Sequence, residues 1–292
     1  MKELTMYRMT VLLLVCLTGC SPKSVTTLSE VVKTLGATID VNKRGQIVRV
    51  DFHDTRLTDV ELIHIGKLDR LQDLNLNNTQ VTDAGLVYLK GLNNLTWLCL
   101  NETHITDAGL VHLQGLTRLE NLLLYSTRIT DEGLGHLKQL TSLSTLHLFN
   151  TRITDAGLKH LRALPRLYYL DLDFNRITDA GLSHLKELTS LELLMLDATR
   201  ITDAGLGHLE GLTGLKFLTL RHTHVTDKGL EHLELLTKLY HLDLSDTRIT
   251  DAGLGCLKGL TSLERLLLEN THVTDAGIAG LQQALPNCEI SQ

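Results

Sequence analysis

The 292-residue chain has few aromatic residues, no long apolar run and no excess of positive charge. One Trp, six Tyr and four Phe make up 4% of the residues, so any place where they gather is informative. The apolar run MTVLLLVCLTG near the N-terminus has eleven residues, fewer than the roughly 20 that a membrane helix needs. The formal net charge of −6 argues against general nucleic-acid binding, which depends on a basic face that neutralises phosphates.

Motifs of common enzyme classes are also missing. There is no nucleophile elbow, phosphate-binding loop or HExxH sequence. Apart from two cysteines near the N-terminus, Cys99, Cys256 and Cys288 are scattered and odd in number, which does not indicate a disulfide framework. We therefore expect no catalytic residue, no cofactor and no metal site.

The N-terminus carries the features of an export signal. Lys2 and Arg8 precede the short apolar run, which is typical of a signal peptide. The run ends in Leu17-Thr18-Gly19-Cys20, which resembles the lipobox of bacterial lipoproteins. That resemblance implies cleavage after residue 19 and a lipid on Cys20, and Ser21 favours the outer membrane. The alternative is an ordinary or uncleaved signal peptide.

A six-residue phrase, ITDAGL in its commonest form, recurs every 24 residues without an insertion or deletion. Within one unit, Leu146 and Leu148 alternate as in a strand with one buried face. Leu158, Leu161 and Leu164 then recur at a spacing of three, which predicts a short helix. Such a unit cannot bury its leucines alone, so the units must stack. The ten copies begin at Leu57, Val81, Ile105, Ile129, Ile153, Ile177, Ile201, Val225, Ile249 and Val273.

The spacing of these leucines resembles the leucine-rich repeat, L-x-x-L-x-L-x-x-N/C-x-L. The chain is similar to bacterial leucine-rich repeat lipoproteins of the internalin-like kind, and its ITDAGL phrase is similar to the cysteine-containing repeats of F-box substrate receptors. This resemblance implies an α/β fold: a right-handed horseshoe solenoid of ten 24-residue repeats, with parallel strands on the concave face and helices on the convex face. We expect a signal peptide (1–19), a lipid-anchored tether and N-terminal cap (20–45), the repeats (46–280) and a C-terminal cap (281–292). Residues 20–45 are too few for an F-box, and Pro286 is expected to break the repeat phase.

When the repeats are aligned, some positions carry the same residue in nearly every repeat, and we call such a set of equivalent residues a column. These columns are expected to be structural. Thr and Asp of each phrase precede a helix, where we expect them to cap free N–H groups and oppose the helix dipole. The glycine of each phrase is expected to allow neighbouring helices to pack closely. Where the family has Asn or Cys, this chain has Thr in all repeats but one, and the threonine hydroxyls should still bind loop backbone. The exception is Asn175.

Two further columns are basic. A histidine column precedes a helix leucine, and metal binding there is disfavoured because packed helix axes lie roughly 8–10 Å apart. The alternative that we favour is a partly exposed helix residue copied by duplication. A second column includes Arg128, Arg152, Arg176 and Arg200, which are expected to form a row beside the sheet. This row either binds an acidic glycan or partner, or is neutralised by nearby aspartates, which is the interpretation that we favour. The histidine column consists of His64, His112, His136, His160, His184, His208 and His232.

The concave face is where the repeats differ, because alternate strand residues point away from the core. The only Trp and most of the Phe fall on this face, which indicates a binding surface. The expected ligand-binding residues are Trp97, Leu123, Tyr125, His147, Phe149, Tyr169, Asp171, Asp173, Phe174, Met195, Asp197, Phe217 and Arg221.

The acidic side chains on this face leave an alternative open. Asp171, Asp173 and Asp197 should lie close together, with His147 and Arg221 beside them. Such a cluster is able to hold a cation or to perform acid–base chemistry. The simpler interpretation is that Arg221 neutralises Asp197.

The function expected from the sequence is binding of a protein or glycan ligand by a monomer held at the bacterial envelope through its N-terminal lipid. Nucleic acid is not an expected partner. Two alternatives remain. One is a structural envelope spacer without a ligand, and the other is an intracellular adaptor resembling F-box-type receptors.

Overall fold

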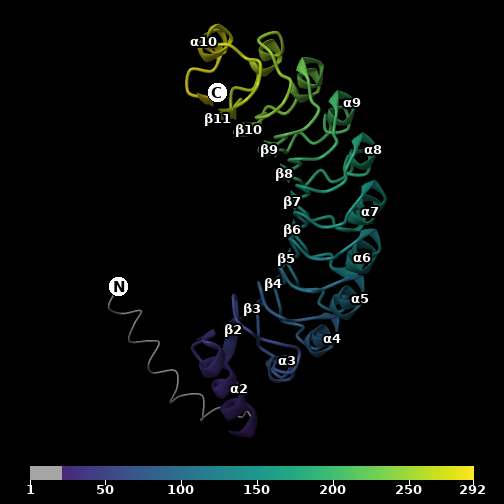
Figure 1. Cartoon of the computed structure of the whole chain (residues 1–292), viewed down its shortest axis with the longest axis vertical. Coiled ribbons are helices and arrows are strands. Elements are labelled where there is room, and N and C mark those ends of the chain that lie inside the picture. The colour runs from purple at the N-terminus through teal and green to yellow at the C-terminus, as the bar shows by residue number, and fades with distance from the viewer. Residues whose placement is uncertain (1–21) are drawn as a thin grey trace, which may run out of the picture.

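The computed structural model describes residues 22–292, and the expected signal peptide and Cys20 lie outside this range. The chain forms a crescent, with strands along its inner side and helices along its outer side (Figure 1). All twelve strands belong to one sheet, in which their spatial order is their order in the sequence. The expected leucine-rich repeat horseshoe is confirmed.

The strands are short and, after the first, parallel. β1 and β2 form an antiparallel hairpin, and every later strand pairs in parallel with the one before it at an offset of 24 residues. The strands are β1 Thr38–Val41, β2 Ile47–Asp51, β3 Asp73–Asn75, β4 Trp97–Cys99, β5 Asn121–Leu123, β6 Thr145–His147, β7 Tyr169–Asp171, β8 Leu193–Met195, β9 Phe217–Thr219, β10 His241–Asp243, β11 Arg265–Leu267 and β12 Glu289–Ser291.

The outer layer consists of α-helical turns, several of which continue as 3₁₀ helices, labelled η. The α-helices are α2 Pro22–Leu35, α3 Leu62–Ile65, α4 Asp83–Leu86, α5 Asp107–Leu110, α6 Asp131–His136, α7 Asp155–Leu158, α8 Asp179–Leu182, α9 Asp203–Leu206 and α10 Asp275–Ala284. The 3₁₀ helices are η2 Val87–Leu89, η3 Val111–Leu113, η4 Leu137–Gln139, η5 Lys159–Ala163, η6 Asp227–Leu233 and η7 Gly253–Leu257.

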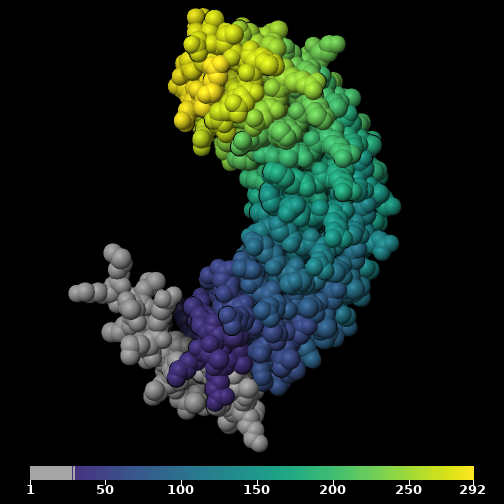
Figure 2. All heavy atoms as spheres, viewed as in Figure 1, coloured from purple at the N-terminus to yellow at the C-terminus, as the bar shows by residue number. Residues whose placement is uncertain are grey.

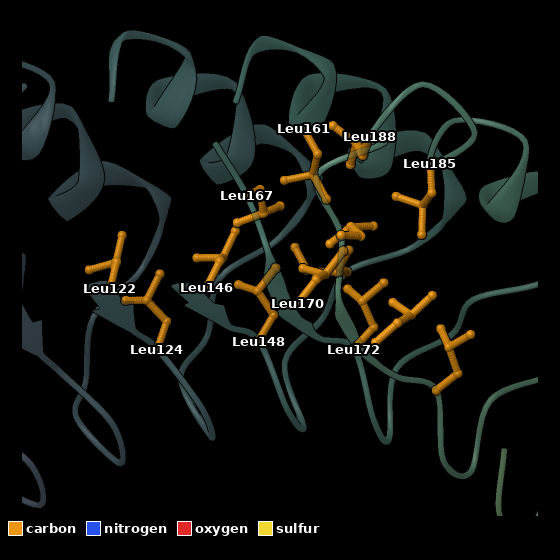
Figure 3. Close-up of a cluster of buried hydrophobic side chains, with 14 of the residues drawn as sticks. Leu122, Leu124, Leu146, Leu148, Leu161, Leu167, Leu170, Leu172, Leu185 and Leu188 are labelled. Carbon is orange, nitrogen blue, oxygen red and sulfur yellow. The ribbon is translucent and has the colours of Figure 1, made fainter. Parts of the chain in front are cut away.

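Leucines from both layers fill the space between strands and helices. In the central repeats Leu146 and Leu170 point from the strands toward Leu161 and Leu185 on the helical side (Figure 3). All four are fully buried. The two periodicities in the sequence therefore meet in one continuous core, which no single repeat closes.

A carboxylate ladder joins successive repeats. The aspartate of each phrase accepts two hydrogen bonds from the threonine of the next phrase, 23 residues later. For Asp155, Thr178 donates its backbone N–H to Oδ1 at 2.8 Å and its hydroxyl to Oδ2 at 2.6 Å. The same pair of bonds recurs from Asp59–Thr82 to Asp251–Thr274. The expected helix cap is thus wrong for the aspartates, because both oxygens are bound by the neighbouring repeat. It is confirmed for some of the threonines, as where Thr82 accepts the N–H of Ala84.

The glycine of each phrase makes room for this carboxylate. A Cβ at Gly229 would lie 2.6 Å from Asp203 Oδ1, far inside van der Waals contact, and the equivalent glycines are at least as crowded. The expected close approach is confirmed, but the neighbour is a carboxylate as well as a helix. Glycine is needed at this position because an aspartate occupies the space.

The first repeat lacks this glycine, because no aspartate carboxylate from an earlier repeat occupies the space. Thr58 has no preceding aspartate, and Glu61 stands where later phrases have glycine. The Glu61 carboxylate accepts the N–H of Thr58 at 2.9 Å and its hydroxyl at 2.7 Å. A local glutamate therefore supplies the two bonds that an aspartate supplies elsewhere, and no glycine is required.

The threonine column in the loops acts within each repeat. Thr127 Oγ1, for example, donates to the carbonyl of Leu124 at 2.6 Å. Only Asn175 reaches further: its Nδ2 donates to the Leu148 carbonyl at 2.6 Å, and its Oδ1 accepts from Ile153 N at 3.2 Å. The threonines therefore bind loop backbone as expected, whereas the link between repeats at this level occurs at Asn175.

Both ends of the sheet are closed by modified repeats. α2 and the β1–β2 hairpin cover the first end, where Leu28 is buried against the core. At the other end, Leu285 and Cys288 are buried one residue later than the 24-residue spacing requires. β12 nevertheless returns to the register, since Arg265 pairs with Glu289. The phase break expected at Pro286 is therefore local, because the longer α10 shifts only the segment between helix and strand.

We predict that Asp155→Ala lowers the free energy of unfolding by about 2–3 kcal/mol, because two donors of Thr178 lose a charged acceptor. Gly181→Ala should also be destabilising, because its methyl group would collide with the Asp155 carboxylate. In the Asp155→Ala background, Gly181→Ala should cost much less. Urea unfolding of the two single variants and the double variant measures this coupling. Additive costs would contradict the ladder.

Candidate functional site

The inner side of the crescent is the candidate binding surface, and it is visibly hollowed (Figure 2). Each strand sends its middle residue into the core and its flanking residues to this surface. The expected concave residues are therefore on the expected face. Most of them are only half exposed, because neighbouring strands bring their side chains together.

One ring group lies where β5, β6 and β7 end. The rings of Tyr125 and Phe149 are 6.2 Å apart in an edge-on arrangement, and Phe149 is 5.0 Å from Phe174. The hydroxyl of Tyr125 donates to Glu102 Oε1 at 2.5 Å, which raises the pKa of Tyr125 to about 12. Phe174 is 57% exposed, the most exposed ring of the group. These contacts hold the rings in place without a ligand.

A second apolar row follows the beginnings of the strands. Tyr169, Leu193, Phe217 and His241 are successive register partners on β7 to β10. Phe217 stacks on His241 at 4.1 Å with the rings nearly parallel, and His147 stacks on Tyr169 at 4.4 Å. The sequence analysis did not single out Leu193 or His241, although both occupy concave positions.

The rings expected on the concave face do not form one continuous patch. Trp97, on β4, is separated from Tyr169 by Asn121 and Thr145, which are its register neighbours on β5 and β6. Tyr240 was missed because it precedes its strand, yet its ring lies 6.3 Å from Phe217. The signal for Tyr240 was its aromatic type at a repeat position that is polar in most other units.

Acidic side chains lie between the two apolar groups and bind strand-end amides. Asp171 Oδ1 accepts from the N–H of Asp173, Asp173 Oδ1 from that of Asp197, and Asp197 Oδ1 from that of Arg221. The first N–H after each strand still bonds to the next repeat's backbone, as that of Leu172 does to the Met195 carbonyl, and a carboxylate satisfies the second. These acids therefore have a structural role.

The expectation that Arg221 neutralises Asp197 is wrong. The guanidinium of Arg221 pairs with Asp246 at 2.8 Å, on the loop of the next repeat, and only its backbone N–H reaches Asp197. Burial and the charges of Asp197 and Asp171 raise the pKa of Asp173 to about 8. Burial likewise raises the pKa of Asp197. The centre of the concave face thus holds carboxyl groups that are costly to ionise.

Histidines and cysteines give no further site. The seven column histidines are half-buried on the helical side, as the duplication interpretation predicts. Two of them are bound by neighbours: His136 contacts Gln114 and His232 contacts Glu210. Cys99, Cys256 and Cys288 are free thiols. Within residues 22–292, no group of three or more His, Cys, Asp or Glu is arranged to hold a metal ion.

Comparison with known protein families agrees with the architecture. A model described as Leucine rich repeat matches residues 165–225, one described as Leucine Rich repeats (2 copies) matches 141–187, and another Leucine Rich repeat model matches 71–90 and 236–258. The matched residues are thus similar to leucine-rich repeats, in agreement with the horseshoe fold. No curated protein sequence matches it significantly.

Solved structures extend the likeness to most of the solenoid. An internalin from Listeria monocytogenes is 22% identical with a TM-score of 0.55, over 90% of this chain and 93% of that chain. Internalin C2 from the same organism is 28% identical with a TM-score of 0.56, over 72% of this chain and 83% of that chain. A structure described as PEPR1-AtPEP1 is 18% identical with a TM-score of 0.54, and the match spans 36% of its length. Stacked repeats of this kind form an extended concave surface.

The raised pKa of Asp173 predicts a pH-dependent stability. Between pH of about 4 and 8 the folded state binds a proton at Asp173 that the unfolded state has lost, so stability falls as pH rises through this window. Asp173→Asn keeps the acceptor for the Asp197 N–H and removes the ionisation. We expect it to raise the melting temperature by about 2–4 °C or more at pH 8, and hardly at all at pH 4. Thermal melts at both pH values test this, and an equal effect at both would contradict it.

Proposed function

We propose that this protein captures a protein ligand with its concave face. The supporting observation is the preset arrangement of rings on that face, with Tyr125 held by Glu102 and packed against Phe149. Anchors that are already ordered lose little side-chain entropy when a partner covers them, and aromatic residues dominate many interfaces. The protein acts as a binding scaffold, not as an enzyme.

The two apolar groups suit two parts of one partner. A partner seated on the inner side would cover Tyr125, Phe149 and Phe174 with one segment, and Tyr169, Leu193 and Phe217 with another. The carboxyl groups of Asp171, Asp173 and Asp197 lie between these segments. A basic side chain of the partner would favour the ionised form of Asp173, whose pKa is raised to about 8, so binding should release a proton near pH 7.

We further propose that the protein is exported and held at the bacterial envelope by a lipid on Cys20, with the outer membrane as its site. Support comes from the sequence Leu17–Cys20 after a short apolar run. Within residues 22–292, no helix is long and apolar enough to cross a membrane. We expect the mature protein to be a monomer, with residues 20–45 as tether and cap before the repeats.

Substitution of two concave rings tests the binding surface. Tyr125→Ala with Phe149→Ala should abolish capture of the ligand from envelope extract, while circular dichroism stays unchanged and stability falls by only about 1–2 kcal/mol. The control is Tyr88→Ala with Leu235→Ala, which removes two exposed apolar side chains on the helical side.

A protein captured by the wild type and the control variant, but not by the ring variant, would support the proposal. Capture that survives loss of both rings would contradict it. If the wild type and the ring variant capture the same proteins, or neither captures any, the structural-spacer interpretation is favoured.

Replacing the predicted lipidated residue tests the anchor. In cells expressing the full chain, Cys20→Ala should move the protein from the membrane fraction to the soluble fraction, because the acyl chains are lost. Metabolic labelling with a fatty acid should mark the wild type and not the variant. An unlabelled wild type, or a variant that remains membrane-bound at mature size, would show that the lipoprotein assignment is wrong.

A further inference from the structure

The arginine row, Arg128, Arg152, Arg176 and Arg200, lies on the loops that follow β5 to β8. All four side chains are exposed. The row was expected to be neutralised by nearby aspartates. In the part of the chain that the structure describes, however, no carboxylate lies within 4 Å of these guanidinium groups, and none of them donates a hydrogen bond. The row is therefore free to bind a ligand.

The reason lies in the carboxylate ladder. The aspartates beside the row, Asp131, Asp155 and Asp179, have both oxygens bound by threonines of the next repeat. They are half-buried and fixed in direction, whereas the arginines point into solvent. An approaching anion therefore meets the guanidinium groups before it meets the carboxylates.

At one loop position beside the row the chain has no acidic residue, and Asp173 and Asp197, one residue earlier, each bind a strand-end amide. Two residues before each arginine, the chain has a residue with a left-handed backbone conformation. Beside the row these are Ser126, Asn150, Phe174 and Ala198. The acidic members of this column, Asp54, Glu102 and Asp246, all lie in repeats outside the row. Positive charge is thus concentrated over four successive repeats of an acidic protein.

Phe174 is unusual in this column. Its φ is +56°, a conformation that is unfavourable for a bulky residue and that Asn or Asp adopts more readily. It is also 57% exposed, so its ring is not needed to fill a core. An exposed ring kept at a strained position, two residues from Arg176, is suited to stacking against a flat apolar surface of a ligand.

We propose that the arginine row, with Phe174, binds an acidic polysaccharide that carries a carboxylate or sulfate on successive sugar units. Backbone bridges from Thr130 to Arg152, Thr154 to Arg176 and Thr178 to Arg200 keep the loops at strand spacing, about 4.8 Å. An extended acidic peptide places side chains of one face about 6.6 Å apart, so it would fall out of step with the row. A glycan also offers the apolar face of a sugar ring to Phe174.

The arginines of this site are separate from the ring surface proposed for a protein ligand, and Phe174, which contacts Phe149, is the one residue that both share. The arginines lie on the edge where the strands end, outside the concave columns. A polysaccharide that contacts several arginines at once would bind more tightly than any single contact allows. Once the first acidic group is bound, the next ones face their arginines at a high effective concentration. Such binding should weaken with salt, since exposed charges are screened.

The test measures binding of the purified full chain to heparin and to polygalacturonate, as sulfated and carboxylated probes, and to polyglutamate as an acidic peptide. Arg152→Ala, Arg176→Ala and Arg200→Ala together should weaken binding to at least one polysaccharide tenfold or more. The matched control replaces Lys138, Lys159 and Lys186 by Ala, an equal charge change on the helical side. This control should alter affinity less than twofold.

Phe174→Asn separates stacking from charge. Asn occupies the equivalent position in three other repeats, so this variant should have a higher melting temperature while binding the polysaccharide several-fold more weakly. Its weak binding to polyglutamate should be unchanged. Phe217→Ala, which alters the concave face at a ring that contacts Tyr240 and His241 and not Phe174, should keep full polysaccharide binding. This result would distinguish the site from the concave one.

Equal weakening by the arginine and lysine variants would overturn the proposal, because charge alone would then explain retention. Polyglutamate binding at least as tight as the polysaccharides would show that an acidic peptide is the true ligand class. Failure of the wild type to bind either polysaccharide at low salt would also reject the proposal.

Discussion

Each repeat extends one aspartate carboxylate over the glycine of the next repeat, where a threonine binds both of its oxygens. This contact explains most of the ITDAGL phrase. The isoleucine and leucine enter the core, the threonine donates, the aspartate accepts for the following repeat, and the glycine leaves space. Because the bonds are charged and well aligned, they fix the distance and rotation between neighbouring repeats. The first repeat supports this interpretation, since Glu61 replaces the glycine where no aspartate precedes it.

The same ladder determines what is left free for function. It engages the aspartates on one side of the loops, so the arginine row beside them stays unpaired. Asp171, Asp173 and Asp197 on the concave face are similarly engaged by strand-end amides. Groups that look catalytic or neutralising in the sequence are therefore structural. The groups that remain free are the rings of the inner side and the guanidinium groups of the edge.

The architecture was predictable because its signal repeats. Every strand after the hairpin lies where the 24-residue period and the alternation of leucines place it, as Leu146 and Leu170 illustrate. The faces of the concave residues follow from the same alternation. Contacts made at a 23- or 24-residue separation were harder to foresee, since a column of identical aspartates gives no hint of its partner. Arg221 shows the difficulty: Asp197 and Asp246 are both within one repeat of it, and the bend of the loop decides between them.

Details that depend on a single residue also escaped prediction. Asn175 links two repeats because its amide is long enough to reach the preceding loop, while the threonines around it are not. Tyr240 joins Phe217 although it precedes its strand. The local shift near Pro286 is corrected by β12, because the sheet imposes its register on the last segment. In each case the contact is determined by the length of a side chain or by a neighbouring element, and not by the 24-residue period.

The uniform offset of 24 residues between paired strands also bears on how the protein reaches its native state. Nearly every stabilising contact joins a repeat to the one just before it, so the chain is able to fold by adding one unit at a time to an existing edge. The β1–β2 hairpin and α2 provide the first such edge at the N-terminal end. Until the next unit has folded, the growing edge exposes its strand and its leucines. The partly folded chain is therefore prone to aggregate with other chains. At the C-terminal end of the described residues, the longer α10 and the displaced Leu285 and Cys288 depart from the repeat and cover the core of the preceding unit.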